Sequence, residues 1–473
     1  MASGINDSNK LKMRVRVYLV ANEAEVQRLM GAPGSSVAGF YRPEEGGALA
    51  VVPRNTGSGG TFTGQLVLFH EYAHHHMLQY TPAAYPAWYV EGFAELASTA
   101  SFERKGTITY GKPASHRQYE LEYTSRYSPS EMVDGTYLKD RDRKRSWSYG
   151  DAWLLTHYLT FSDDRRGQLR RYLVDINRGA ELPEAAAAFG DLGKLRQDVG
   201  SYLRARSFPY KPVPLPQIAP DAISLRTLSP AEAALVPFEI ELVRMTNLPD
   251  GRGKESDDAD GADATAEGTS KDDAKAAAKV EAELAKAMQE RDDWLAKLAA
   301  VAERHSGDPA PWRLLAWARC ESEDYTGCSE AADRVLATKP DDARAMVYKS
   351  DALFALGRDE DDDALRETLQ TEARALVERA LVLDRDDPKV LLAYYYSYDG
   401  QTNAGLEALQ RAVQYVPQLS GPRLTLAHAL VARGRLGEAR TILRPLAYAP
   451  HGGSAAEAAR TLLDTVDEKL AAR

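Results

Sequence analysis

The sequence predicts an α+β domain followed by an all-α helical repeat domain, and three observations favour this fold class. Alternating strand-like segments come first and amphipathic helical segments follow them. An acidic stretch without large apolar residues then interrupts the chain at 256–270. Beyond it, Ala- and Leu-rich segments recur with a period of 34 residues. We expect the first domain at 11–207, a Pro-rich connection with a flexible linker at 208–275, and the repeats at 276–473.

Length and charge narrow the class of protein. A chain of 473 residues exceeds one ordinary core. The net charge is −10 and Lys and Arg do not cluster, which argues against a nucleic-acid partner. No apolar run approaches the roughly 20 residues of a membrane span. The polar start "MASGINDSNK" lacks the apolar core of a signal peptide. The compartment stays open: periplasmic or secreted if a signal peptide has been removed, and cytoplasmic otherwise.

The elements of the first domain follow from local patterning. Residues 11–20 alternate and are rich in β-branched side chains, which predicts a strand, and 22–31 predicts a helix. Residues 38–53 are typical of a hairpin. The segment 65–79 places apolar side chains at spacings of three and four, which indicates a helix with an apolar stripe. Further helices are expected to fill 88–207.

The C-terminal segments predict helical hairpins. Residues 309–342 and 388–421 each contain a helix, a short turn, a second helix and a Pro, Asp or Gly break, and 422–453 follows the same pattern. Residues 343–387 are a longer copy with an acidic insertion, and 454–470 is expected to be a capping helix. The period and pattern resemble tetratricopeptide repeats. This resemblance implies a curved stack of hairpins with a concave surface for a protein or peptide partner.

"FHEYAHHH", residues 69–76, contains the pattern H-E-x-x-H. His70 and His74 are four residues apart, so both imidazoles project from one face of a helix, one turn apart. Glu71 directly follows the first of them. Two such histidines are ligands that Zn²⁺ prefers, and the glutamate is placed to act as general base on a zinc-bound water. The pattern also arises by chance, and the next two histidines point to other faces as surface or packing residues.

A second helical segment, "YPAWYVEGFAELAST", supplies carboxylates. Glu91 and Glu95 are again four residues apart, on a face that is otherwise apolar. Two acids on such a face are costly unless a cation compensates them. A carboxylate from this helix would complete a His₂Glu zinc site and leave one position open for water.

H-E-x-x-H followed by W-x-x-E-G-x-A is similar to the pattern of gluzincin metallopeptidases, which include peptidase-MA-like proteins. The resemblance extends over about residues 11–207 and its specific part is 65–99. It implies a zincin-like fold, with His70, His74 and Glu91 as zinc ligands and Glu71 as catalytic base. It further implies that Glu95 hydrogen-bonds a ligand histidine and orients it.

The chain departs from the aminopeptidase pattern in two respects. Sixteen residues separate His74 from Glu91, which is fewer than in that pattern. The motif with which aminopeptidases hold a free amino terminus is absent, and "GGALAVV" stands in the comparable place. A strand in that place would pair with an extended substrate, so an endopeptidase is expected rather than an aminopeptidase.

A donor for the developing oxyanion is expected in "WSYGDAWLLTHYLTF", residues 147–161. Similar proteins have a tyrosine at the start of this helix, which implies Tyr149 as the catalytic donor. His157 is the second candidate, and its alternative is a histidine packed in the core. His116 and Arg117 are expected in a solvated loop, with contact to substrate as the alternative.

The two cysteines, Cys320 and Cys328, lie at the adjoining ends of two predicted repeat helices. They fit a disulfide of an oxidising compartment and a reduced packing pair equally well.

Taken together, the sequence predicts a zinc metallopeptidase of gluzincin type with Zn²⁺ as cofactor. Its partners are a protein or peptide substrate and a protein bound by the repeats. Two alternatives remain open. The repeats could be the working part of a scaffold with an inert zinc domain, or the zinc site could hydrolyse an amide that is not a peptide.

Overall fold

The computed structural model describes residues 13–56, 62–103, 106–124, 127–139, 149–205, 207–214, 225–247, 271–398, 400, 402–449 and 453–472. The predicted acidic linker at 256–270 lies outside these residues. The chain divides into two compact units. The sheet unit consists of residues 14–27, 34–223 and 417–473, and the helical unit of residues 1–13, 28–33 and 224–416.

A three-stranded sheet opens the sheet unit, in the order β1 (Val15–Asn22), β3 (Gly47–Asn55), β2 (Phe40–Glu44). Strand β1 runs parallel to β3 and β2 runs antiparallel to it. Helix α1 (Glu23–Met30) follows β1 in the chain. The side chains from 48 to 52 on the central strand β3 are buried, so the apolar run "ALAVV" fills the middle of the sheet.

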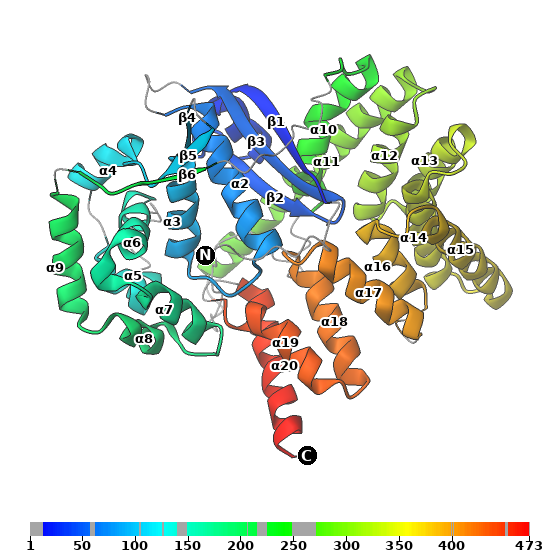
Figure 1. Ribbon diagram of the computed structural model, residues 1–473. Coiled ribbons are helices and arrows are strands. Elements are labelled where there is room, and N and C mark those ends of the chain that lie inside the picture. The colour runs from blue at the N-terminus through cyan, green and yellow to red at the C-terminus, as the bar shows by residue number, and fades with distance from the viewer. Residues whose placement is uncertain are drawn as a thin grey trace. The chain divides into compact units, whose positions relative to one another are not determined.

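Helix α2 (Gly64–Tyr80) packs on β3 and β2 and contacts α3 (Ala87–Ser98) (Figure 1). Thr63 caps α2, because its Oγ1 accepts a hydrogen bond from the backbone N–H of Leu66 at 3.2 Å. Pro86 precedes α3 in an extended conformation that proline favours and that ends the connection between the two helices. The element order brings the two predicted site helices into direct contact.

Helix α6 (Tyr149–Phe161) packs along α3 and completes the core of the sheet unit. Trp88 and Trp153 are fully buried in one apolar cluster, and Trp88 lies against Tyr172. A second sheet is antiparallel, in the order β4 (Ser101–Glu103), β5 (Thr107–Tyr110), β6 (Lys211–Pro214).

The remaining elements of the sheet unit are helical: η1 (Ser115–Arg117), α4 (Gln118–Tyr123), α5 (Pro129–Asp134), η2 (Thr136–Lys139), η3 (Asp163–Arg165), α7 (Gln168–Ile176), α8 (Leu182–Ala185), η4 (Ala186–Phe189), α9 (Leu192–Leu203), α18 (Ser420–Ala432), α19 (Leu436–Ala447) and α20 (Gly453–Ala471).

The helical unit is all-α over its described residues: α10 (Pro230–Thr246), α11 (Lys271–Arg304), α12 (Pro309–Glu321), α13 (Tyr325–Thr338), α14 (Ala343–Arg358), α15 (Asp363–Leu383), α16 (Pro388–Ser397) and α17 (Asn403–Tyr415). Consecutive helices from α11 to α17 contact each other, as expected for stacked hairpins. The acidic insertion in the longer copy falls at the turn between α14 and α15. Cys320 and Cys328 form a disulfide between α12 and α13, with Cα atoms 5.1 Å apart.

Part of the predicted connection is helical instead. Helix α10 lies within 208–275, because Ser229 and Glu232 form a reciprocal capping box and Pro230 occupies the first helical position. The prolines that precede this segment favour an irregular connection, so the sequence did not predict the start of a helix here. The domain boundaries themselves stay predictions.

The general part of the fold-class prediction, a domain with strands and helices followed by helical repeats, agrees with the structure. The repeat region is helical, and the N-terminal part has strands as well as helices. The zincin-like fold of that part stays a prediction. In the described part of the chain, none of the helices is both long enough and apolar enough for a bilayer crossing.

Candidate metal centre

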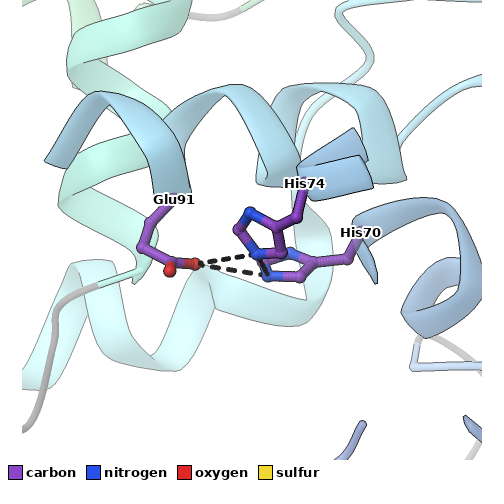
Figure 2. Close-up of side chains that lie close together, drawn as sticks. All are labelled: His70, His74 and Glu91. Carbon is purple, nitrogen blue, oxygen red and sulfur yellow. Dashed lines mark hydrogen bonds and ion pairs between the residues drawn. The ribbon is translucent and has the colours of Figure 1, made fainter. Parts of the chain in front are cut away.

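His70 and His74 project from one face of α2 toward the same point, as Figure 2 shows. Their Nε2 atoms are 3.2 Å apart. Both side chains are mostly buried, with exposed fractions of 12% and 14%. The one-turn spacing on a regular helix produces this arrangement directly.

Glu91 reaches the same point from α3 (Figure 2). Its Oε2 lies 3.3 Å from Nε2 of His70 and 3.7 Å from Nε2 of His74. Because α3 packs along α2, the carboxylate approaches the pair of imidazoles from the side. Within the described residues, these three side chains are the one group of His, Cys, Asp and Glu whose ligand atoms all lie within 4.8 Å of one another.

The three separations fit a tetrahedral metal ion. Zinc holds nitrogen and oxygen ligands at roughly 2.0–2.2 Å, so two ligand atoms of a tetrahedral site are about 3.3 Å apart. Glu91 Oε2 is buried, and no residue in the described ranges gives it a hydrogen bond of good geometry. A cation would compensate this oxygen, and the donor set of two imidazoles and one carboxylate is one that zinc prefers.

Glu71 is buried on the same helix, directly beside His70. Burial, together with the negative charges of Glu91 and Glu95, raises its pKa to about 7 against the opposing charge of His70. The backbone comes close to the Glu71 carboxylate on one side, because a Cβ on Gly39 would lie 3.1 Å from its Oε1 and 2.4 Å from a methyl carbon of Val67. Glycine before β2 therefore leaves room for this side chain.

Glu95 lies behind His70, where it is completely buried. Its Oε1 is 3.3 Å from Nδ1 of His70, and its Oε2 is 2.8 Å from Nε2 of His116. Arg117 donates from Nε to Glu95 Oε1 at 3.1 Å. Burial alone would raise the pKa of Glu95, but hydrogen bonds with His116 and His70 and the charge of Arg117 hold it well below its usual range. Glu95 thus places a negative charge beside Nδ1 of His70.

The solvated loop expected around His116 and Arg117 is therefore wrong. The exposed fractions of these side chains are 2% and 23%, because both bind the buried carboxylate of Glu95. The sequence did not reveal this contact because the carboxylate that both side chains bind lies 21 residues before His116 and 22 residues before Arg117. The available indication was the unpaired second acid of the α3 motif, which needs cationic partners.

Tyr149 begins α6 beside the cluster. Its ring centroid is 6.0 Å from that of His70, and the guanidinium carbon of Arg117 lies 4.5 Å from its ring centroid. Burial, and then the negative charge of Glu91, raise the pKa of Tyr149, so its hydroxyl keeps its proton and can donate. The structure brings this candidate donor to the site.

His157 is not brought to the cluster. It lies two turns further along α6, about 12 Å from the helix start. Its Nε2 donates to the carbonyl oxygen of Gly111 at 2.8 Å, so its Nδ1 accepts from the Tyr202 hydroxyl at 2.8 Å. It stacks on Phe161. These contacts fit the alternative expected from the sequence, a histidine packed in the core.

Gly92, directly after Glu91, sets the distance between α3 and α6. A Cβ at this position would lie 2.1 Å from Oγ1 of Thr156 and 2.4 Å from the carbonyl oxygen of Ala152. Backbone cannot yield as a flexible side chain does, so only glycine allows this approach. Two adjacent residues of α3 therefore have linked roles: Glu91 supplies the carboxylate, and Gly92 allows the close contact with α6.

Comparisons with known proteins concern the repeats. The family model of the tetratricopeptide repeat matches residues 398–463, a range that does not include the His–Glu cluster. No curated protein matches the chain.

Solved structures similar to the chain include the following two. A thermophilic tetratricopeptide-repeat protein of Thermus thermophilus is 19% identical, with 37% of this chain and 90% of that chain covered and a TM-score of 0.31. MamA of Desulfovibrio magneticus is 18% identical, with 41% and 96% covered and a TM-score of 0.25. These scores are too low to bear on the fold. The family match shows that the C-terminal region contains tetratricopeptide repeats, which are protein-binding elements.

Proposed function

We propose that the chain is a zinc-dependent peptide hydrolase, an endopeptidase of gluzincin type, whose C-terminal repeats bind protein. This proposal rests on one observation: His70 and His74 from α2 converge with Glu91 from α3 at separations suited to one tetrahedral ion. When bound, zinc would lower the pKa of a coordinated water and polarise the scissile carbonyl.

The chain's own residues divide the remaining work. Glu71 lies beside His70, where its carboxylate can accept the proton of the attacking water and later pass it to the leaving amine. The Tyr149 hydroxyl, which keeps its proton, can donate a hydrogen bond to the oxyanion that develops on the substrate carbonyl. Glu95 holds the ring of His70 through Nδ1, so that Nε2 faces Glu91.

The absence of an amino-terminus motif before the zinc helix supports an endopeptidase. The strand at "GGALAVV" that was expected to pair with substrate is β3, which is already paired with β1 on one side and β2 on the other, so that expectation is wrong for this strand. Strand β2 is an edge of the same sheet and lies beside α2. An edge strand has free backbone donors and acceptors with which an extended peptide can pair.

The second candidate function is a scaffold or adaptor in which the repeats are the working part. The family match at 398–463 favours it, because that match identifies protein-binding repeats and no catalytic element. In this case the His–Glu cluster would hold a metal for stability alone.

One experiment separates the two functions. We would measure zinc stoichiometry and cleavage of a peptide library for wild type, for Glu71→Gln, and for Glu457→Gln as an exposed control on α20. The hydrolase predicts about one zinc in each protein and a loss of about 100- to 10,000-fold in cleavage for Glu71→Gln only. Zinc in all three proteins without cleavage in any of them would contradict the hydrolase and favour the scaffold.

A further inference from the structure

Arg117 contacts both the carboxylate behind His70 and the candidate oxyanion donor. Its Nε and Nη2 both donate to Oε1 of Glu95, with the Nε bond at 3.1 Å. Its guanidinium carbon lies 4.5 Å from the ring centroid of Tyr149, over the ring. Glu95 Oε1 is in turn 3.3 Å from Nδ1 of His70. Arg117 thus contacts both Tyr149 and Glu95, and Glu95 lies against the candidate metal ligand His70.

The segment that carries Arg117 is fixed at both ends. On one side, His116 binds the second oxygen of Glu95 at 2.8 Å. On the other side, Glu120 Oε2 accepts a hydrogen bond from the backbone N–H of Gly150 at 3.2 Å, and lies 4.0 Å from Nη1 of Arg117. Because Gly150 is the second residue of α6, this bond holds the helix start that bears Tyr149.

The arrangement needs an arginine. A guanidinium is planar, so it can direct two N–H groups at one carboxylate oxygen while its face covers an aromatic ring. A lysine ammonium would keep the charge beside Glu95 but would have neither the fork nor the flat face. Lysine at this position therefore tests geometry with the charge retained.

We propose that Arg117 is a positioning residue that couples the metal centre to Tyr149. It fixes Glu95 against His70 and, with the same guanidinium, fixes the Tyr149 ring beside the site. What Tyr149 contributes to turnover rests on the proposed function. The effect of Arg117 on metal affinity does not, so the two can fail separately.

The first test is metal affinity, measured by competition with a chromophoric chelator, together with the visible spectrum of the cobalt-substituted protein. Arg117→Met should weaken zinc binding about 10-fold, the lower end of the effect of losing a partner of a metal ligand, because Arg117 acts on His70 through Glu95. Arg117→Lys should weaken it less, and Tyr149→Phe should not change it. Arg166→Met, an exposed arginine paired with Asp163, is the matched control and should not change it either.

The second test reports the Tyr149 ring without turnover. With 3-fluorotyrosine at position 149, the ¹⁹F resonance should move in both Arg117 variants and stay in place in Arg166→Met. Circular dichroism and melting of Arg117→Lys, which keeps the buried charge, separate a positioning effect from unfolding.

Unchanged zinc affinity in both Arg117 variants, or an unmoved ¹⁹F resonance, would overturn the coupling. Both effects in a protein that cleaves no peptide would support the coupling and contradict the proposed hydrolase.

Discussion

The four histidines of α2 fall into two pairs with different surroundings. His70 and His74 face Glu91, whereas His75 binds the Tyr41 hydroxyl through Nδ1 at 3.0 Å, and the His76 ring lies near Tyr80. A helix turns about 100° per residue, so neighbours in sequence point to different faces. His75 thus links α2 to strand β2. It has a structural role although it directly follows the candidate metal ligand His74.

Tyr149→Phe isolates the proposed oxyanion donor. Removing the hydroxyl should lower kcat about 100- to 1,000-fold with little change in KM, because the lost hydrogen bond forms with the developing oxyanion rather than with bound substrate. Steady-state kinetics and zinc content together check this. Tyr123→Phe, an exposed tyrosine on α4, is the control. An equal loss in both variants, or a Tyr149→Phe enzyme with normal kcat, would contradict the role.

His157 should make the fold sensitive to acid. Burial lowers its pKa below the ordinary value of 6.5, against weaker opposing hydrogen bonds with Gly111 and Pro209. The unfolded chain therefore takes up this proton first as the pH falls. The stability that His157 contributes is complete above about pH 6.5 and declines below it, with a slope of at most about 1.4 kcal/mol per pH unit.

Unfolding of wild type and His157→Gln between pH 7.5 and 5 measures that contribution by difference. We expect the stability of wild type to fall more steeply with acid than that of the variant, since glutamine can donate to Gly111 without titrating. Parallel pH profiles would show that His157 binds its proton equally in both states.

At the scale of elements, contact between α3 and α6 determines whether Glu91 and Tyr149 meet. Gly92→Ala should force the two helices apart, because the new methyl group meets the Ala152 backbone at 2.4 Å. We expect about 1–3 kcal/mol of destabilisation. Weaker zinc binding should accompany it, since Glu91 is the adjacent residue.

Gly200→Ala in α9 is the matched control for that change. Its Cβ would meet only the Arg204 side chain at 3.7 Å, an ordinary contact, so helix propensity should make the variant as stable as wild type or more stable. Urea unfolding and zinc titration of both variants check the pair of expectations. A Gly92→Ala protein with unchanged stability and zinc affinity would show that α3 and α6 do not need this approach.

The local sequence pattern predicted most of the helices and strands. The features that it did not predict depend on contacts between residues distant in the sequence. The strand at 15–22 and the helices at 64–80 and 87–98 follow from alternation and from three- and four-residue spacing. The short strands β4 and β5 have too few residues for a pattern. The residues around Arg117 do not indicate which groups it binds, because its partners Glu95 and Tyr149 are distant in sequence and meet it only in the folded unit.

At the scale of the whole molecule, the helical unit repeats one polar contact between its hairpins. Asp342 caps α14 through the Ala345 N–H at 3.1 Å and receives Arg313 of α12 at 2.8 Å. Asp387 caps α16 and receives Arg344 of α14 at 2.6 Å. Each aspartate thus joins a helix start to the preceding hairpin, which makes neighbouring repeats depend on each other.

Asp342→Ala should destabilise the helical unit by about 2 kcal/mol, from the lost cap and the Arg313 left without its partner. Glu290→Ala, which removes one partner of an exposed pair with Lys286 on α11, should change stability by less than about 0.5 kcal/mol. Urea unfolding followed by circular dichroism compares the two. Equal midpoints for both variants would mean that the repeated contact is not a stabilising one.

Metal removal should act on one unit alone. All three proposed ligands belong to the sheet unit, so zinc can stabilise only the states in which α2 and α3 are folded together. At zinc concentrations about 1,000 times the dissociation constant, binding adds about 4 kcal/mol, which corresponds to roughly 1,000-fold slower exchange of amides that open with the site. Hydrogen–deuterium exchange with and without chelator measures this for each helix. Peptides from α2 and α3 should lose protection, while those from α12 to α16 should not change, and His70→Ala should exchange rapidly in either condition. Equal loss of protection in both units, or none in α2, would contradict a metal centre at His70, His74 and Glu91.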